Sequence, residues 1–429
     1  MRARHAVTAP RLILINVFIR IAAAASGQLF AFVLAERMGA RAGAGSLLAG
    51  LIGVCYYLTE MVGAPLAGHI ADVRGQLRVL RWGPMFGVAA VLLGAAAALE
   101  VSAVPVLAAL LIAARLAEGA SAACAVPTTL VLLSRATERE GADGASLRLR
   151  LMGVFEIASL GGLILGYLVA GIAWDSFGGF AFLLLPILYV AAWAITLGES
   201  TETRRPVRKP RQSSLRSILA LRAVTGFTVA WLAVNAVVGV WLQQAPFLLK
   251  LPLRSTSQTL VGGYSGSTIG VIFAIWGALF LTGIALWSLL APRWPRRSIL
   301  TVALGGMLVV VASLTLVNRG APSWILGVAA IAVMVESGFT PAAFAYLADL
   351  TDAHESSRGR AMGVYSLLLG VGQLVGAVVG APLAARWQMN GVLAATGLLA
   401  LVALAGVARM KAQVRPQVRP QPPRGSGEA

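Results

Sequence analysis

The sequence has little charge for its length, and what it lacks excludes several classes of protein. Only 12% of its 429 residues are charged, and acidic residues number 17. Its two cysteines and three histidines are scattered, at spacings that fit neither a disulfide framework nor a metal cluster. It contains no Gly-rich loop ending in Gly-Lys-Ser/Thr, no His-Glu-x-x-His and no Gly-x-Ser-x-Gly. We therefore expect no ATP-driven pump, no enzyme activity, no bound metal and no cofactor.

What the chain has instead is twelve long apolar stretches. Hydrophobic residues make up 58% of it, and the mean hydropathy is +0.81. A helix needs about 20 mostly apolar residues to cross a bilayer. Because a backbone in lipid must satisfy its own hydrogen bonds, each stretch is predicted to be a helix. The alternating segments of a transmembrane β-barrel are missing from the sequence. The predicted spans are 12–36, 45–70, 79–100, 104–133, 150–172, 179–198, 223–247, 267–291, 299–317, 322–347, 361–384 and 390–410.

Positive charge gathers on alternate connections between these spans. Of 35 basic residues, 27 lie at the two ends of the chain and after every second span, while the other connections hold six. Short loops rich in Lys and Arg stay in the cytoplasm, so both termini are predicted to be cytoplasmic. The net charge of +18 then faces anionic lipid, and we expect no nucleic-acid partner. The abundance of arginine, alanine and glycine indicates a GC-rich bacterial genome, and hence the cell inner membrane.

The chain divides into two similar halves. Its longest polar connection, residues 199–222, is basic and lies midway along the chain. The sequence Met-Gly-Val-Phe at 152–155 returns as Met-Gly-Val-Tyr at 362–365, which indicates an internal duplication, a common transporter design. The predicted parts are a cytoplasmic N-terminus (1–11), an N-terminal six-helix bundle (12–198), a basic cytoplasmic linker (199–222), a C-terminal six-helix bundle (223–410) and a disordered basic cytoplasmic tail (411–429).

The connection after the second span carries a turn motif. An acid at a helix end is followed by a glycine that permits a tight reversal and by basic residues that face anionic lipid. With Gly68, Asp72 and Gly75 in register, and Arg74 and Arg78 as basic residues, the motif resembles the loop Gly-x-x-x-Asp-Arg-x-Gly-Arg-Arg of the major facilitator superfamily. In that family the loop is a conformational latch between helices, so the resemblance implies this role for the same five residues.

The fourth span extends the resemblance. Arg115-Leu-Ala-Glu118-Gly resembles the superfamily's Arg-x-x-Gln-Gly-x-Gly, with Glu118 in place of the glutamine. Three positions apart, Arg115 and Glu118 share a helix face. They form either an ion pair that only neutralises two buried charges or a functional charge in the transport pathway. The resemblance implies an all-α integral membrane protein, with twelve transmembrane helices in two pseudo-symmetric six-helix bundles.

The fifth span points to a subgroup. Gly153, Gly162 and Gly166 have the spacing of Gly-x8-Gly-x3-Gly-Pro in the drug:proton antiporter families, but Tyr167 stands where those families have proline. Glycines at this spacing also allow close helix packing. Both interpretations of the three glycines, packing and antiport, remain open at this point.

Polar residues inside the spans are the candidate site. A charge near the bilayer centre costs about 3 kcal/mol on insertion scales and usually faces a cavity or a partner. A proton carrier must titrate near neutral pH, which loss of hydration favours for a carboxyl group. Because no basic residue neighbours them on their own helices, Glu60 and Glu336 are the first candidates for proton coupling, ahead of Glu118 and Glu156. The candidates for the substrate cavity are Arg20, Gln28, Tyr56, Arg115, Asn235, Gln243 and Gln244.

These observations favour a secondary active transporter that works by alternating access. We expect proton-coupled efflux of a small amphipathic or hydrophobic compound, by a monomer in the lipid bilayer. The alternative is a proton symporter or an uncoupled facilitator for a small metabolite such as a sugar or an organic acid. The partners expected are the small-molecule substrate, protons and lipid.

Overall fold

A computed structural model describes residues 8–99, 103–137, 144–197, 222–290, 294–351 and 358–410 of the chain. The predicted tail and all of the predicted linker except Arg222 lie outside these residues. The described chain forms helices and contains no β-strand. In the first half these are α1 (Ala9–Met38), η1 (Gly39–Arg41), α2 (Ala42–Arg74), α3 (Gln76–Leu99), α4 (Val104–Thr137), α5 (Gly144–Phe177), η3 (Gly178–Leu184) and α6 (Leu185–Leu197). In the second half they are α8 (Arg222–Lys250), α9 (Gly266–Leu290), α10 (Arg296–Asn318), α11 (Ile325–Glu336), α12 (Phe339–Thr351), α13 (Arg358–Trp387) and α14 (Met389–Ala408).

The described helices confirm a multi-pass membrane protein. Ten stretches are long and apolar enough to cross a bilayer, and two of them, Ala9–Arg74 and Gly153–Leu197, each contain two helices joined by a 3-10 turn. The described chain therefore makes the twelve passes that the sequence predicts. Most helices run several residues beyond the predicted spans, and α1 already begins at Ala9, inside the segment predicted to be a cytoplasmic N-terminus.

The tenth span is confirmed as a span, but it is not one continuous helix. It is divided into α11 and α12 by a turn at Ser337 and Gly338. Pro341, four residues after Ser337, has no N–H to offer the Ser337 carbonyl, so a regular helix cannot pass through this point without losing a hydrogen bond. The span predicted over 322–347 is present, and the break inside it at Ser337 and Gly338 was not predicted.

The two halves repeat the same packing. In the first, α1 lies against α5, and a methyl group added at Gly162 would lie 2.9 Å from the Cβ atom of Arg20. In the second, α8 lies against α13, and the same addition at Gly372 would lie 2.6 Å from the Cβ atom of Asn235. Because glycines lie in register in both pairs, the internal repeat of the sequence corresponds to a structural repeat.

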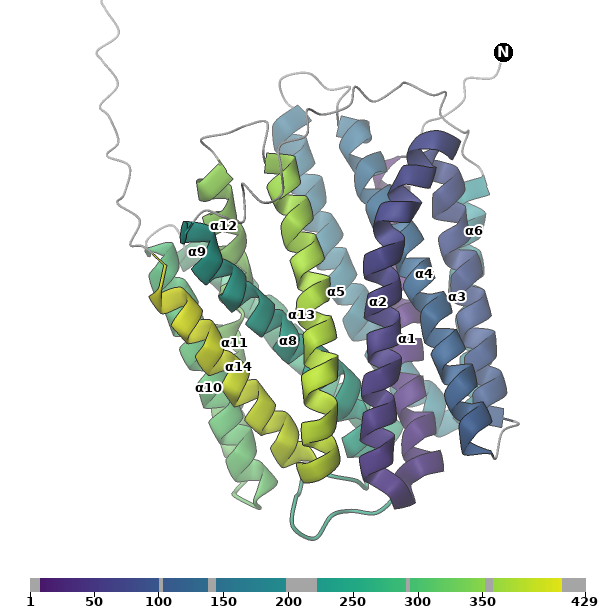
Figure 1. The fold of residues 1–429 in the computed structure, drawn as a ribbon, viewed down its shortest axis with the longest axis vertical. Helices are drawn as coiled ribbons and strands as arrows, with labels where there is room; N and C mark the ends of the chain where they lie inside the picture. Colours follow the sequence, from purple (N-terminus) through teal and green to yellow (C-terminus); the bar gives the residue numbers. More distant parts are fainter. Residues whose placement is uncertain are drawn as a thin grey trace, which may run out of the picture.

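The halves meet chiefly along two helix pairs, α2 with α13 and α5 with α9, and α8 also lies against α1 and α2 (Figure 1). The N-terminal half of α2 approaches the C-terminal half of α13: a methyl group at Gly43 would lie 3.2 Å from the carbonyl oxygen of Ala385. The end of α5 meets the start of α9, where the backbones of Gly171 and Gly266 touch. Figure 1 shows that both approaches lie at the end of the molecule away from the N-terminus. We call this end, where Gly43, Ala385, Gly171 and Gly266 lie, the closed end.

Candidate functional site

The site begins with an ion pair on α4. Arg115 and Glu118 lie one turn apart, and both are buried, with 6% and 1% of their surface exposed. A guanidinium nitrogen of Arg115 donates to the Glu118 carboxylate, whose other oxygen accepts from the Ser26 hydroxyl on α1. The sequence prediction that Arg115 and Glu118 share a helix face is therefore confirmed. Both carboxylate oxygens of Glu118 therefore have a hydrogen-bond donor.

Aromatic rings enclose the guanidinium of Arg115. Its central carbon lies 4.7 Å from the ring centre of Tyr56 on α2 and 5.5 Å from that of Phe30 on α1. Such contacts stabilise a cation by about 1–2 kcal/mol where water is excluded. Among the described side chains, the Nε atom of Arg115 has no hydrogen-bond partner. Arg115 is thus fixed from several directions and keeps one unused donor.

A residue of the second half reaches this ion pair. Gln243 on α8 is 7% exposed; its Oε1 accepts a long hydrogen bond of 3.5 Å from Arg115, and its Nε2 donates to the Tyr57 hydroxyl at 3.4 Å. It passes close to α2 at Gly53, where a methyl group would lie 2.6 Å from its amide carbon, so that a larger residue there would displace the amide. Arg115, Tyr57 and Gly53 belong to the first half, so Gln243 bridges the two halves at the ion pair.

The other polar residues of α1 and α2 adjoin the same cluster. The Glu60 carboxylate faces the Tyr56 hydroxyl and lies in the electrostatic field of Arg20. A cavity of about 10 Å³ is lined by Asn16, Arg20, Tyr56, Glu118, Ser121 and five apolar residues. This volume is close to the minimum for a single water molecule. This cavity is therefore too small for a substrate in the described arrangement.

The remaining cavity candidates differ in their surroundings. Gln244 donates to the backbone carbonyl of Ser46 across the two halves, at 3.1 Å. Asn235 is 8% exposed and donates to a carbonyl of its own helix. Gln28 is fully buried, and neither of its amide atoms has a partner among the described side chains. Of these three, Gln244 is the one that links the halves.

Two of the candidate carboxylates lie outside the cluster. Glu156 lies on an exposed face of α5, within the field of Arg20. Glu336 is half-buried at the end of α11, directly before the break in the tenth span. Within the described part of the chain its carboxylate forms neither an ion pair nor a hydrogen bond. The structure thus brings Glu60 and Glu118 together and leaves Glu156 and Glu336 apart from them.

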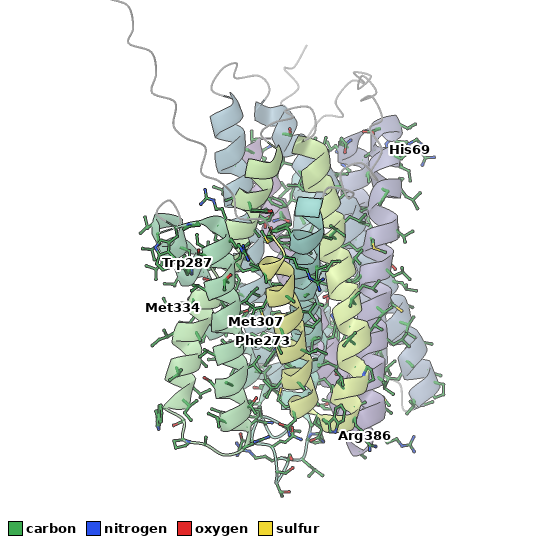
Figure 2. All side chains as sticks on the ribbon, turned by 60° about the vertical axis from the view of Figure 1, so that its left-hand side comes forward. His69, Phe273, Trp287, Met307, Met334 and Arg386 are labelled. Atoms are coloured by element: carbon green, nitrogen blue, oxygen red, sulfur yellow. The ribbon has the colours of Figure 1, made fainter. Side chains whose placement is uncertain are left out.

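The loop after α2 forms the predicted turn. The helix ends at Arg74, and Gly75 takes a positive φ of 98°, a conformation that favours glycine. Asp72 accepts a hydrogen bond of 3.1 Å from Gln76, and Asp72, Arg74 and Arg78 are exposed. The turn lies at the end of the molecule opposite the closed end, as His69 and Arg386 show in Figure 2. A role of these residues, with Gly68, as a latch stays a prediction.

Two of the three spaced glycines of α5 are explained by packing. A methyl group at Gly166 would lie 2.5 Å from the carbonyl oxygen of Ile21, and Gly162 is similarly close to Arg20. Gly153, in contrast, has open space around it. Since Gly162 and Gly166 let α5 pack against α1, their spacing does not by itself require an antiporter.

Sequence analysis missed the break in the tenth span and the contact that stabilises it. The indole N–H of Trp287 on α9 donates to the carbonyls of Met334 and Val335, at 3.2 and 3.1 Å (Figure 2). A methyl group at Gly338 would lie 2.5 Å from the Trp287 ring. Ser337, Gly338 and Pro341 were the available signal, but the indole that donates to the Met334 and Val335 carbonyls comes from another helix and gives no local pattern.

It also missed a contact across the closed end. Asp175, in the last turn of α5, accepts hydrogen bonds from the backbone N–H groups of Gly266 and Ser267, both at 2.7 Å. These are the first residues of α9, whose N-terminal N–H groups lack partners within the helix. A carboxylate of the first half therefore caps a helix of the second half.

An all-helical membrane protein whose two halves meet at a buried ion pair has the architecture of a transporter. The sequence model of the Major Facilitator Superfamily matches residues 17–333 and 259–428. The chain belongs to this superfamily, whose members carry small-molecule substrates. The protein is accordingly a transporter rather than an enzyme.

Solved structures of the same fold are distant in sequence. The nucleoside transporter NupG is 12% identical, with a TM-score of 0.68 over 95% of this chain and 100% of the other. A D-xylose-proton symporter is 15% identical, with a TM-score of 0.65 over 94% and 99%. The inward-open xylose transporter XylE from E. coli is 15% identical, with a TM-score of 0.67 over 96% and 98%. No curated protein matches the sequence. At these identities the likeness concerns the fold alone.

Proposed function

We propose that the protein is a proton-coupled secondary transporter for a small polar solute, built from two six-helix bundles that expose a central site alternately to each side. The observation that carries this proposal is the ion pair of Arg115 and Glu118, buried inside a span where Gln243 arrives from the other half. A buried ion pair contributes little net stability, because desolvation offsets the attraction. Charges kept inside a membrane are usually functional.

Glu118 is the proton carrier in this proposal, ahead of Glu60 and Glu336. With the closed end shut, Arg115 and Ser26 hold the ionised carboxylate. When the halves move apart at the closed end, Gln243 withdraws and the pair loosens, so that Glu118 accepts a proton. Returning to the described arrangement restores the pair and releases the proton. Glu60, beside Tyr56 and Arg20, passes protons to or from Glu118.

The orientation follows from the charge pattern. Cytoplasmic termini place the closed end on the outer side of the inner membrane. The described arrangement is then inward-facing, the state in which the XylE structure was also solved. A proton taken up from outside and released inside follows the usual direction of the proton gradient across the bacterial inner membrane.

Polar groups beside the small cavity support a polar solute. Asn16, Arg20, Tyr56 and Ser121 offer amide, guanidinium and hydroxyl groups there, next to five apolar residues. Charges of both signs are present, so the lining suits a neutral molecule rich in hydrogen-bonding groups. The nucleoside and xylose transporters that share the fold carry substrates of this kind. Efflux of an amphipathic compound is the second candidate, favoured by the antiporter-like spacing of Gly153, Gly162 and Gly166.

Reconstituted liposomes test this proposal. Uptake of radiolabelled D-xylose and uridine is measured with and without a pH gradient, and extrusion of ethidium is measured in parallel. We expect gradient-driven accumulation of D-xylose or uridine, lost in Glu118→Gln. Accumulation that ignores the gradient would refute proton coupling, and gradient-driven extrusion of ethidium alone would favour efflux. If none of the three probes moves, the proposed substrate class is wrong.

A further inference from the structure

We infer that Gln243 couples the relative position of the two halves to the charge of the Arg115–Glu118 pair. In this role its amide positions Arg115 and does not contact substrate. This inference rests on the proposed function. Its starting observation is that the Gln243 amide belongs to one half, while its partners Arg115 and Tyr57 belong to the other.

The Gln243 amide lies between the two halves. Its side chain passes α2 at Gly53, where a methyl group would lie 2.6 Å from the amide carbon. Its Nε2 is anchored on the Tyr57 hydroxyl, which leaves its Oε1 directed at the guanidinium of Arg115. Since Gln243 is fixed on α8, this acceptor reaches Arg115 only while the closed end is shut.

Gln243 therefore makes the ion pair depend on the arrangement of the halves. With Gln243 in place, Arg115 is held from α8, from two aromatic rings and by Glu118, and it stays against the carboxylate. Without Gln243, Arg115 loses one acceptor and is less strongly held against Glu118. The carboxylate then binds a proton more readily. By thermodynamic reciprocity, protonation of Glu118 must favour opening of the closed end.

The sign of the pH effect follows. The ionised form of Glu118 is favoured in the closed arrangement, so the closed arrangement is stabilised in alkaline buffer and loses that stabilisation as the pH falls. Other titratable groups near Glu118 come from four further helices, and their own titration contributes a background that does not depend on Gln243. These groups are Arg20, Tyr56, Tyr57, Glu60, Tyr167 and Tyr189.

Gln244 provides a matched control. It is the next residue on α8, it is also buried, and it also crosses to the first half, but its partner is the uncharged carbonyl of Ser46. Substituting methionine for either glutamine keeps the side-chain length and removes the amide. Both substitutions delete one contact between the halves, and only the one at Gln243 removes an acceptor for Arg115.

The experiment measures the closed end directly and needs no substrate. Spin labels are placed on cysteines introduced at Arg41 and Leu253, which are exposed and lie on opposite halves near the closed end. Cys55 and Cys124 are replaced by alanine. Electron–electron distance distributions then give the ratio of closed to open molecules across a pH series. Hydrogen bonds to charged groups predict a change of about tenfold in this ratio between mildly alkaline and mildly acidic buffer.

We expect the pH dependence to disappear in Gln243→Met and to persist in Gln244→Met, even where Gln244→Met shifts the ratio as a whole. If Gln243→Met fails to fold, Tyr57→Phe removes the anchor of the same amide and should flatten the dependence partly. A wild-type dependence that survives in Gln243→Met or in a folded Tyr57→Phe overturns the inference.

A failure of the proposed function would give a different result from a failure of this inference. The ratio of closed to open wild-type molecules would then not change with pH, or its change with pH would persist in Glu118→Gln. A purely substrate-binding role for Gln243 is also distinguishable, because it predicts a raised KM for uptake with an unchanged pH profile in Gln243→Met. That result, too, overturns the inference.

Discussion

Asp175 should hold the closed end shut, and its removal provides a quantitative test of the described arrangement. Each of its carboxylate oxygens accepts a hydrogen bond from a backbone N–H group at the start of α9, with a nitrogen–oxygen distance of 2.7 Å. A hydrogen bond to a charged group contributes about 1.5–3 kcal/mol, and the helix N-terminus adds about 0.3–1 kcal/mol. The Asp175 side chain is exposed, so water can replace much of this interaction. We therefore expect the Asp175 contacts to stabilise the closed arrangement by about 1–2 kcal/mol in total.

Asp175→Ala is therefore expected to lower the ratio of closed to open molecules about 5- to 30-fold. The spin-label pair at Arg41 and Leu253 gives this ratio. Asp175→Asn keeps one acceptor oxygen and should produce a smaller shift in the same direction. Ser176→Ala is the matched control, since among the described residues the Ser176 hydroxyl donates to the Ile172 carbonyl of its own helix and to no residue of the second half.

The reasoning would be refuted if the distance distribution of Asp175→Ala superimposed on that of Ser176→Ala. The carboxylate would then be an ordinary helix cap without influence on the two halves. A shift toward the closed arrangement would contradict the account even more directly, because it would mean that Asp175 opposes closure.

Three further predictions concern packing and buried charge. Glu118→Gln leaves Arg115 as an uncompensated buried charge and should cost about 3–5 kcal/mol of stability; replacing Glu118 and Arg115 together by leucine should restore much of the melting temperature in detergent. Gly166→Val should prevent α5 from packing on α1 and abolish folded protein on size-exclusion chromatography, whereas Gly153→Val should be tolerated. Trp287→Phe removes the indole donor of the Met334 and Val335 carbonyls, which keep the Ser337 hydroxyl and the Gly338 N–H as donors, and should cost about 0.5–1.5 kcal/mol in thermal unfolding; an unchanged melting temperature would count against this role.

The sequence was sufficient for the fold because lipid leaves few alternatives. Twelve apolar stretches must be helices, whereas the close packing of Gly162 and Gly166 against α1, and of Gly372 and Gly376 against α8, was settled only by the structure. The positive φ of Gly75 was likewise predictable from the turn motif.

The site could be predicted only in part. Arg115 and Glu118 share one helix, so their pairing followed from spacing within a single span. Gln243 and Asp175 act across helices that are distant in sequence, and no spacing along the chain reveals which side chains converge there. For the same reason, the absence of a basic neighbour on its own helix did not show that Glu60 lies beside Arg20 of α1.

The central claim is that Glu118 gains and loses the proton that drives transport. Infrared difference spectroscopy between acidic and alkaline buffer measures this directly, since a protonated carboxyl group gives a separate C=O stretching band. The account predicts a band that vanishes in Glu118→Gln and persists in Glu336→Gln. A band that persists unchanged in Glu118→Gln would contradict the account.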